Sequence, residues 1–328
     1  MIIRQSLLLA LVTVGCTTAA VPAASQSYPG RPITLVVPFA AGAQTDVVAR
    51  IVADHMAKTL GQPIVIENDA GAGGTTATRR AAQAAPDGYT IAAGSMGTHA
   101  AAPAQYPNLR YDPAKDFTPI GLTAEVPTVI VTRKDFPAKD LKEFVDYVRK
   151  NQTKVNEAHA GVGSQSHTYC TLLHWIMGTK TGRVAYRGGA PLINDLVAGQ
   201  VDFSCVSLSS VVSLIQAGKI KAIAIASPER ADVIKDVPTT TEGGLPEFQA
   251  SGWNAIFAPK NTPQEVQAKL NDALVKALDD EGTRKRLLEM GCVIQSKADR
   301  TPQALQKRVE SEVARWASIL KAAGSIDN

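Results

Sequence analysis

The chain has 328 residues, of which 34 are Lys or Arg and 30 are Asp or Glu, so its formal net charge is +4. Apolar residues make up 45% and charged residues 20%, as in an ordinary globular protein. The basic residues are scattered and aromatic residues make up only 5%, which argues against nucleic acid as a partner. The length suggests two domains, since a domain usually has about 100 to 200 residues.

The first 25 residues have the order of a secretory signal peptide. Arg4 precedes an apolar run over 7–15, and small residues follow it. That run is too short to cross a bilayer as a mature helix. Cleavage after Ser25 predicts a mature protein in the periplasm of a bacterium. A lipid anchor on Cys16 is the alternative.

Cleavage would leave three cysteines, Cys170, Cys205 and Cys292. In an oxidising compartment this odd number allows at most one disulfide within the chain. Cys170 and Cys205 are the candidate pair because both are predicted in the same domain. Buried free cysteines that pack as small apolar side chains are the alternative.

Strand and helix patterns alternate in the first part of the mature chain. Short β-branched runs predict strands, and apolar residues at helical spacing predict helices. The strands are expected at 33–38, 63–68 and 90–94, and the helices at 46–60 and 75–85. This alternation predicts a doubly wound α/β unit with a parallel sheet.

A Pro- and Asp-rich loop over 106–117 ends this unit, and the strand 126–132 leads into a second one. There the predicted helices are 141–150, 165–177, 191–198 and 209–217, and the strands are 155–160, 183–186, 201–206 and 220–226. A second crossing is expected near 244–252, followed by the strand 251–259 and the helices 263–278 and 301–323. The sequence therefore predicts two doubly wound α/β lobes joined by two crossing segments.

The predicted lobes are 26–130 with 250–328, and 131–249, with a ligand cleft between them. Two crossing segments would act as a hinge, and hinge closure around a solute is a common use of this geometry.

Gly- and Ser-rich loops follow strands at 39–46, 94–99, 161–167 and 187–190. Ligands of open α/β sheets bind at the carboxyl ends of the strands. Helix N-termini there offer free N–H groups that favour anions, and glycine lets the backbone approach the ligand. Any one of these loops could be an ordinary turn, but their presence in both lobes favours an anion site.

One segment resembles the nucleophile elbow of serine hydrolases. Ala93-Gly94-Ser95-Met96-Gly97 follows a strand, with Ala in place of the first Gly. In those hydrolases the catalytic His comes last, well downstream of the Ser and the acid. The last His here is His174, and nearly half of the chain beyond it has none. A secreted serine hydrolase that uses Ser95 is therefore only the alternative from another class of function.

A metal site and a cofactor are not predicted. His167, Cys170 and His174 share one face of a predicted helix, with His159 on the strand before it. A buried helix face explains them better than a metal. The glycines of 71–76 fail the dinucleotide fingerprint at its last position, and the chain has no P-loop pattern.

Several blocks occur in a fixed order from about Tyr28 to the C-terminus. They are YPGRPITLVVPFAAGAQTDVVAR, DGYT, YDPAKDFTPIG, GVGSQSH, YRGGAPLINDLVAGQVD, AGKIKAIAIA, DVPTTTEGGLPEF, and a Trp followed by APKNTP. In this order the chain resembles the solute receptors of tripartite tricarboxylate transporters, the Bug proteins. The resemblance implies a clamshell like that of type II periplasmic binding proteins, without enzymatic activity, that delivers carboxylates to a permease pair.

The resemblance also implies a binding site. Backbone amides and waters at 39–45 and 161–164 would hold a ligand carboxylate. The first loop has Ala41 and Ala43 where the family usually has Pro and Gly, and Arg187 replaces a usual Lys with a planar fork suited to carboxylates. Met96 would contact an apolar or aromatic part of the ligand. The residues expected to bind ligand are Phe39, Ala41, Gln44, Thr45, Ser95, Met96, Thr98, His99, Gly161, Gly163, Ser164, His167, Arg187, Gly188, Asp202 and Ser207.

The expected protein is thus a monomeric periplasmic receptor for an organic di- or tricarboxylate, aromatic ones such as terephthalate included. An amino acid or another zwitterion is the alternative ligand. No cofactor is expected.

Overall fold

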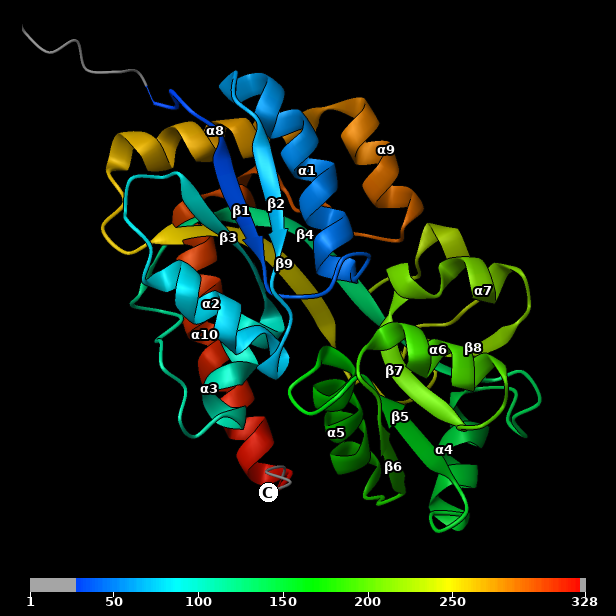
Figure 1. Ribbon diagram of the computed structural model, residues 1–328. Coiled ribbons are helices and arrows are strands. Elements are labelled where there is room, and N and C mark those ends of the chain that lie inside the picture. The colour runs from blue at the N-terminus through cyan, green and yellow to red at the C-terminus, as the bar shows by residue number, and fades with distance from the viewer. Residues whose placement is uncertain (1–27, 325–328) are drawn as a thin grey trace, which may run out of the picture.

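The computed structural model describes residues 28–324, and the predicted signal peptide and Cys16 lie outside them. Figure 1 shows two α/β lobes, one made from both ends of the chain and the other from its middle. The predicted fold class is confirmed.

The first lobe has the strand order β2-β1-β3-β9-β4. Its strands are β1 (Ile33–Val37), β2 (Ile64–Asn68), β3 (Thr90–Ser95), β9 (Ser251–Pro259) and the first part of β4 (Phe117–Arg133). Its helices are α1 (Gln44–Leu60), α2 (Thr75–Ala82), α3 (Ala102–Gln105), α8 (Gln264–Asp279), α9 (Glu281–Glu289) and α10 (Pro302–Ala322). α1 buries Val48, Ile51, Val52 and Met56 on one face, because these residues recur at helical spacing.

The second lobe places the end of β4 between β7 and β8. Its other strands are β5 (Asn156–His159), β6 (Gly182–Ala185), β7 (Phe203–Ser207) and β8 (Ile220–Ala226). Its helices are α4 (Leu141–Lys150), α5 (Gln165–Met177), α6 (Gly189–Val197) and α7 (Val212–Gln216). The carboxylate of Asp140 caps α4 by accepting from the N–H of Glu143 at 2.8 Å.

β4 connects the two lobes. Its residues 117–127 pair with β9, and its residues 128–133 pair with β7 and β8. β9 returns beside it, and the N–H of Thr128 donates to the carbonyl of Ala250. Since one strand leaves the first lobe and the other re-enters it, they run antiparallel to each other. The expected parallel sheet is therefore interrupted by an antiparallel pair.

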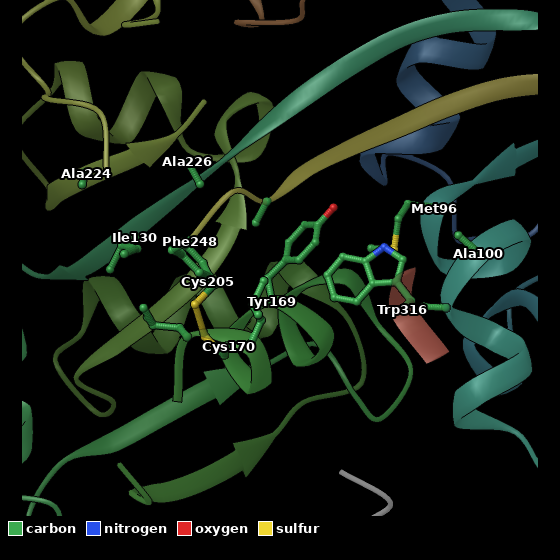
Figure 2. Packing of buried hydrophobic residues seen from close by; sticks show 14 of the residues in the cluster. Met96, Ala100, Ile130, Tyr169, Cys170, Cys205, Ala224, Ala226, Phe248 and Trp316 are labelled. Atoms are coloured by element: carbon green, nitrogen blue, oxygen red, sulfur yellow. A yellow bond between two sulfur atoms is a disulfide. The ribbon is translucent and has the colours of Figure 1, made fainter. Parts of the chain in front are cut away.

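A disulfide between Cys170 and Cys205 joins α5 to β7 inside the second lobe, as Figure 2 shows. The candidate pairing is therefore the one that the structure contains. Cys292 is a buried free cysteine, and burial raises the pKa of its thiol to about 12. The disulfide lies in an apolar cluster in which Tyr169 of α5 packs against Trp316 of α10, with ring centroids 5.5 Å apart.

Three segments differ from the expected elements. The 97–101 segment is a single π-helical turn that continues into α3, where a loop was expected. α9 was not predicted, and the helix expected at 209–217 is a short 3-10 turn followed by α7. Within residues 28–324, no helix combines the length and the apolar character needed to cross a membrane.

Candidate ligand-binding site

The loop after β1 is held in place from within the first lobe. The Asn68 side-chain amide donates to the carbonyl of Phe39 at 3.0 Å and to Asp46 Oδ1 at 2.8 Å. The backbone N–H of Gly42 donates to Asp46 Oδ2, also at 2.8 Å. Burial opposes the charge of Asp46, but hydrogen bonds from Arg50, Asn68 and Gly42 lower its pKa below the usual value. Asp46 is thus a charged anchor for the loop, a role that the sequence pattern did not reveal.

The loop after β5 is held in a similar way inside the second lobe. Ser164 caps α5, with its hydroxyl accepting from the N–H of His167 at 3.2 Å. Ser166 Oγ accepts from the N–H of Ala160 at 2.9 Å. Gly161 and Gly163 have φ values of +105° and +80°, a conformation that favours glycine.

Matching glutamines begin the two helices that follow these loops. Gln44 is the first residue of α1 and Gln165 is the first residue of α5. The Nε2 of each is buried, and neither has a hydrogen-bond partner among the residues that the structure describes. The Oε1 of Gln165 accepts from Ser207 at the end of β7, at 3.1 Å. A buried donor without an acceptor costs about 1–3 kcal/mol, so both amides are suited to a ligand oxygen.

The two lobes touch beside these loops. A Cβ at Gly97, just after β3, would lie 3.8 Å from the carbonyl oxygen of Gly163. The hydroxyl of Tyr106 donates to the carbonyl of Val162 at 3.3 Å. Tyr106 also occupies the space that a side chain at Gly73 would need. Sequence reasoning missed Tyr106, because it lies in a segment read only as a loop.

Ser95 and Thr98 lie at the carboxyl end of β3 and interact with each other. The N–H of Ser95 donates to Thr98 Oγ1 at 3.1 Å, and their hydroxyl oxygens are 3.4 Å apart. Thr98 is buried, while Ser95 is partly exposed.

The structure departs from expectation at Met96 and His99. Met96 is 1% exposed and packs in the apolar cluster of Figure 2, while His99 is fully buried. His99 stacks on Phe257 at 4.0 Å between ring centroids, and its Nδ1 lies 2.9 Å from Thr98 Oγ1. Burial lowers the pKa of His99 to about 3. Met96 directly precedes the helical turn at 97–101 and His99 lies within it, and both side chains are buried, so neither lies on a loop surface.

Asp202 also differs from expectation, because it lies at the opposite edge of the sheet. It precedes β7, and its carboxylate accepts from Arg133 Nε at 2.9 Å and from the N–H of Asn156, the first residue of β5, at 2.8 Å. The loops lie at the carboxyl ends of the strands, whereas Asp202 ties two amino ends together.

The remaining expected residues lie at the carboxyl ends of their strands. Arg187 and Gly188 follow β6, and Arg187 is exposed. Ala41 is exposed, Phe39 half-buried and Thr45 buried.

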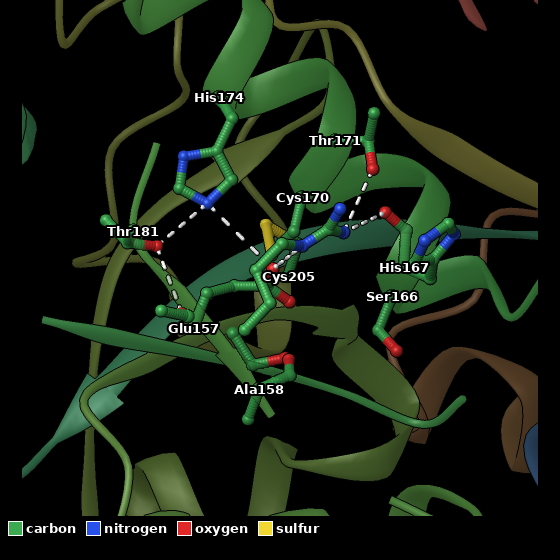
Figure 3. A network of polar contacts seen from close by, with 12 residues as sticks. Glu157, Ala158, Ser166, His167, Cys170, Thr171, His174, Thr181 and Cys205 are labelled. Atoms are coloured by element: carbon green, nitrogen blue, oxygen red, sulfur yellow. Dashed lines mark hydrogen bonds and ion pairs between the residues drawn. A yellow bond between two sulfur atoms is a disulfide. The ribbon is translucent and has the colours of Figure 1, made fainter. Parts of the chain in front are cut away.

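The histidines of α5 lie in a network of polar contacts between α5 and the strands β5 and β6 (Figure 3). Arg183 pairs with the fully buried Glu157 at 2.7 Å and donates to Thr171 at 3.0 Å. His174 lies 3.2 Å from the hydroxyl of Thr181 and 3.9 Å from Glu157 Oε2. Cys170 is not available to a metal because its sulfur is in the disulfide. Within residues 28–324 no group of three His, Cys, Asp or Glu could hold a metal ion.

Two α/β lobes that share a pair of strands, with glycine- and serine-rich loops at the strand ends of each, define the class of two-lobed solute-binding proteins. Residues 48–325 match the family model described as the tripartite tricarboxylate transporter family receptor. The chain belongs to this family, whose members are periplasmic solute receptors and not enzymes.

Relatives of known sequence agree with this assignment. A UPF0065 protein of Agrobacterium vitis is 42% identical over 92% of this chain and 87% of its own length. Protein BugT of Bordetella pertussis is 32% identical over 97% of this chain and 98% of its own.

Solved structures are similar as well. MatC of Rhodopseudomonas palustris, with bound malate, is 46% identical with a TM-score of 0.84. The match covers 89% of this chain and 100% of the MatC chain. A second Rhodopseudomonas palustris protein, with adipate, is 33% identical with a TM-score of 0.85, and the match covers 90% of this chain and 98% of that one.

Proposed function

We propose that this protein is a periplasmic receptor that captures a small organic di- or tricarboxylate between two lobes, residues 26–130 with 250–328 and residues 131–249. It then delivers this solute to the permease subunits of a tripartite transporter. The observation that carries the proposal is the pair of loops at 39–43 and 161–164. Each leads into a helix N-terminus whose first residue is a glutamine with a buried, unpaired Nε2.

The chemistry of these loops favours a carboxylate. Each helix N-terminus offers backbone N–H groups and a partial positive charge, and each glutamine adds an amide donor. Such donors, repeated in two lobes, suit an elongated ligand with an acceptor group at each end. Malate and adipate, which the similar structures contain, are dicarboxylates and are the first ligands to test. Terephthalate is the aromatic dicarboxylate to test beside them.

The surroundings of Ser95 support binding without catalysis. Its hydroxyl has Thr98 beside it at 3.4 Å, and the nearby His99 has a pKa of about 3. A general base works best when its pKa lies near the working pH, so buried His99 is poorly suited to activate a serine. If the wild-type protein hydrolysed carboxylic esters and Ser95→Ala did not, that result would instead support the serine hydrolase.

Calorimetric titration and thermal unfolding of refolded, solute-free protein would test the proposal. Malate, adipate, citrate or terephthalate should raise the melting temperature. Gln44→Ala and Gln165→Ala should each weaken binding by about 5- to 30-fold, since a hydrogen bond to a charged group contributes about 1.5–3 kcal/mol, part of which water replaces. Gln200→Ala, at an exposed position in the second lobe, is the control and should leave affinity unchanged. Stabilisation by amino acids alone would favour the zwitterion alternative, and stabilisation by neutral solutes alone would contradict the proposal.

A further inference from the structure

A hollow of about 330 Å³ lies in the first lobe between the start of α2 and the segment 106–110. The residues around it include two arginines and several polar groups, but no acid. They are Thr75, Thr76, Arg79, Tyr106, Pro107, Asn108, Leu109 and Arg110.

The positive charge of this hollow is not neutralised from within the protein. Arg79 is half-buried and Arg110 is exposed, and neither guanidinium has a hydrogen-bond or ion-pair partner among residues 28–324. Acids near in sequence are paired with other cations: Asp69 lies 3.4 Å from Arg80, and Asp112 lies 3.0 Å from Lys115. Two unpaired guanidinium groups beside one hollow are suited to bind an oxyanion, because each presents a planar fork of donors.

Other groups around the hollow add to this preference. The first turn of α2 has no acidic residue, and Gly74 before it provides no side-chain cap, so the partial positive charge of the helix start is not offset by a side chain. The hydroxyl of Thr76 and the amide of Asn108 are further polar groups at the wall. The helix start alone would define no site. The two arginines give the hollow its net charge.

Tyr106 connects this hollow to the second lobe. It lines the hollow, and its hydroxyl donates to the carbonyl of Val162 at 3.3 Å. A Cβ at Gly73 or at Gly163 would overlap with that same hydroxyl, so Tyr106 fills the space between the two lobes here. A ligand that fixes the 106–110 segment would therefore also fix a contact that exists only when the lobes are together.

We propose that this hollow is a second ligand site, for a small oxyanion with the chemistry shared by phosphate and carboxylate groups. Its occupancy strengthens solute binding at the loops through Tyr106. The binding site itself is independent of the proposed receptor function, whereas the coupling to solute affinity rests on that function.

Titration with inorganic phosphate at constant ionic strength tests the site. Arg79→Gln with Arg110→Gln should weaken phosphate binding at least tenfold. The control, Lys142→Gln with Lys150→Gln, removes two exposed positive charges from α4 in the other lobe and should leave it unchanged. A wild-type protein that binds no phosphate at millimolar concentrations would overturn the proposal. The proposal would also be overturned if the arginine variant bound phosphate as tightly as wild type, or if the arginine and lysine variants lost phosphate affinity to the same extent.

Titration with malate or adipate in the presence and absence of phosphate tests the coupling. Phosphate should raise solute affinity by about fivefold or more, the lower range of allosteric coupling. Tyr106→Phe removes only the hydroxyl that donates to Val162, so it should reduce this coupling by more than it reduces phosphate affinity. Phosphate that competes with the solute, or coupling that persists undiminished in Tyr106→Phe, would overturn the coupling. A second equivalent of solute that binds wild type but not the arginine variant would identify the site's occupant as the carboxylate itself. If no carboxylate binds at all, the receptor function fails, while the phosphate titration still decides the site.

Discussion

A methyl group at Gly163 is expected to weaken solute binding more than it weakens the fold. Gly163 has a φ of +80°, and a Cβ there would overlap with the Tyr106 hydroxyl across the contact between the lobes. The left-handed conformation costs a residue with a Cβ about 1–2 kcal/mol. Overlap in a packed contact costs a further 1–3 kcal/mol or so, which the protein can avoid by separating the lobes. Since about 1.4 kcal/mol corresponds to tenfold in affinity, Gly163→Ala should bind its carboxylate about 5- to 150-fold more weakly.

Gly178→Ala is the matched control for this prediction. Gly178 ends α5 in the same lobe with a φ of +64°, and no atom lies within 4 Å of its Cβ position. It should therefore lose stability in urea denaturation by a similar 1–2 kcal/mol or so, while solute affinity in calorimetry stays unchanged. Adding Tyr106→Ala to Gly163→Ala should recover part of the lost affinity, because it removes the overlap but also the hydrogen bond to Val162. Wild-type affinity of Gly163→Ala, or an equal loss in both glycine variants, would refute the reasoning.

Three further predictions concern stability. Cys170 and Cys205 are 35 residues apart, and their disulfide restricts the unfolded chain over that loop. Replacement of both cysteines by Ala should therefore lower the free energy of unfolding by about 4 kcal/mol, measured by calorimetry beside the reduced wild-type protein. His99 has a folded pKa of about 3, below its unfolded value near 6.5, so the unfolded chain takes up a proton first as pH falls. Wild-type stability should thus fall by about 2 kcal/mol more between pH 7 and pH 5 than that of His99→Phe, and parallel urea curves for the two proteins would contradict this. Arg183→Met leaves the carboxylate of Glu157 buried without its cation and should cost about 3–5 kcal/mol in urea denaturation, whereas adding Glu157→Gln should restore part of the loss.

Periodicity in the sequence predicts the regular elements well where one face is clearly apolar. The structure has helices with the predicted bounds at 141–150 and 165–177, and strands at 220–226 and 251–259. α9 was missed because only Thr283 and Leu287 of its residues are buried, so its apolar pattern is weak. A short helix of this kind is fixed by packing against the rest of the lobe and not by its own sequence.

The candidate site was predictable where it depends on local chemistry. Glycine and serine after a strand indicate the loops at 39–43 and 161–164, and the structure holds both at strand carboxyl ends. Composition does not indicate the direction in which a side chain points, so Met96 and His99 were expected on a surface although they are buried. Tyr106 could not be found at all, since its contact with Val162 joins residues 56 positions apart.

In both halves of the proposed site, the loop is held by side chains of its own lobe. The first loop is fixed by Asp46 and Asn68, and the second by Ser164 and Ser166, and each of these anchors belongs to the same lobe as its loop. Each loop is thus anchored within its own lobe, and Val162 of the second loop also accepts a hydrogen bond from Tyr106 of the first lobe. Binding would therefore not have to order either loop, a cost that usually reduces affinity. The free energy of closure would then depend on the contacts between the lobes, of which Tyr106 with Val162 is one, and on the acceptors that the solute offers to Gln44 and Gln165.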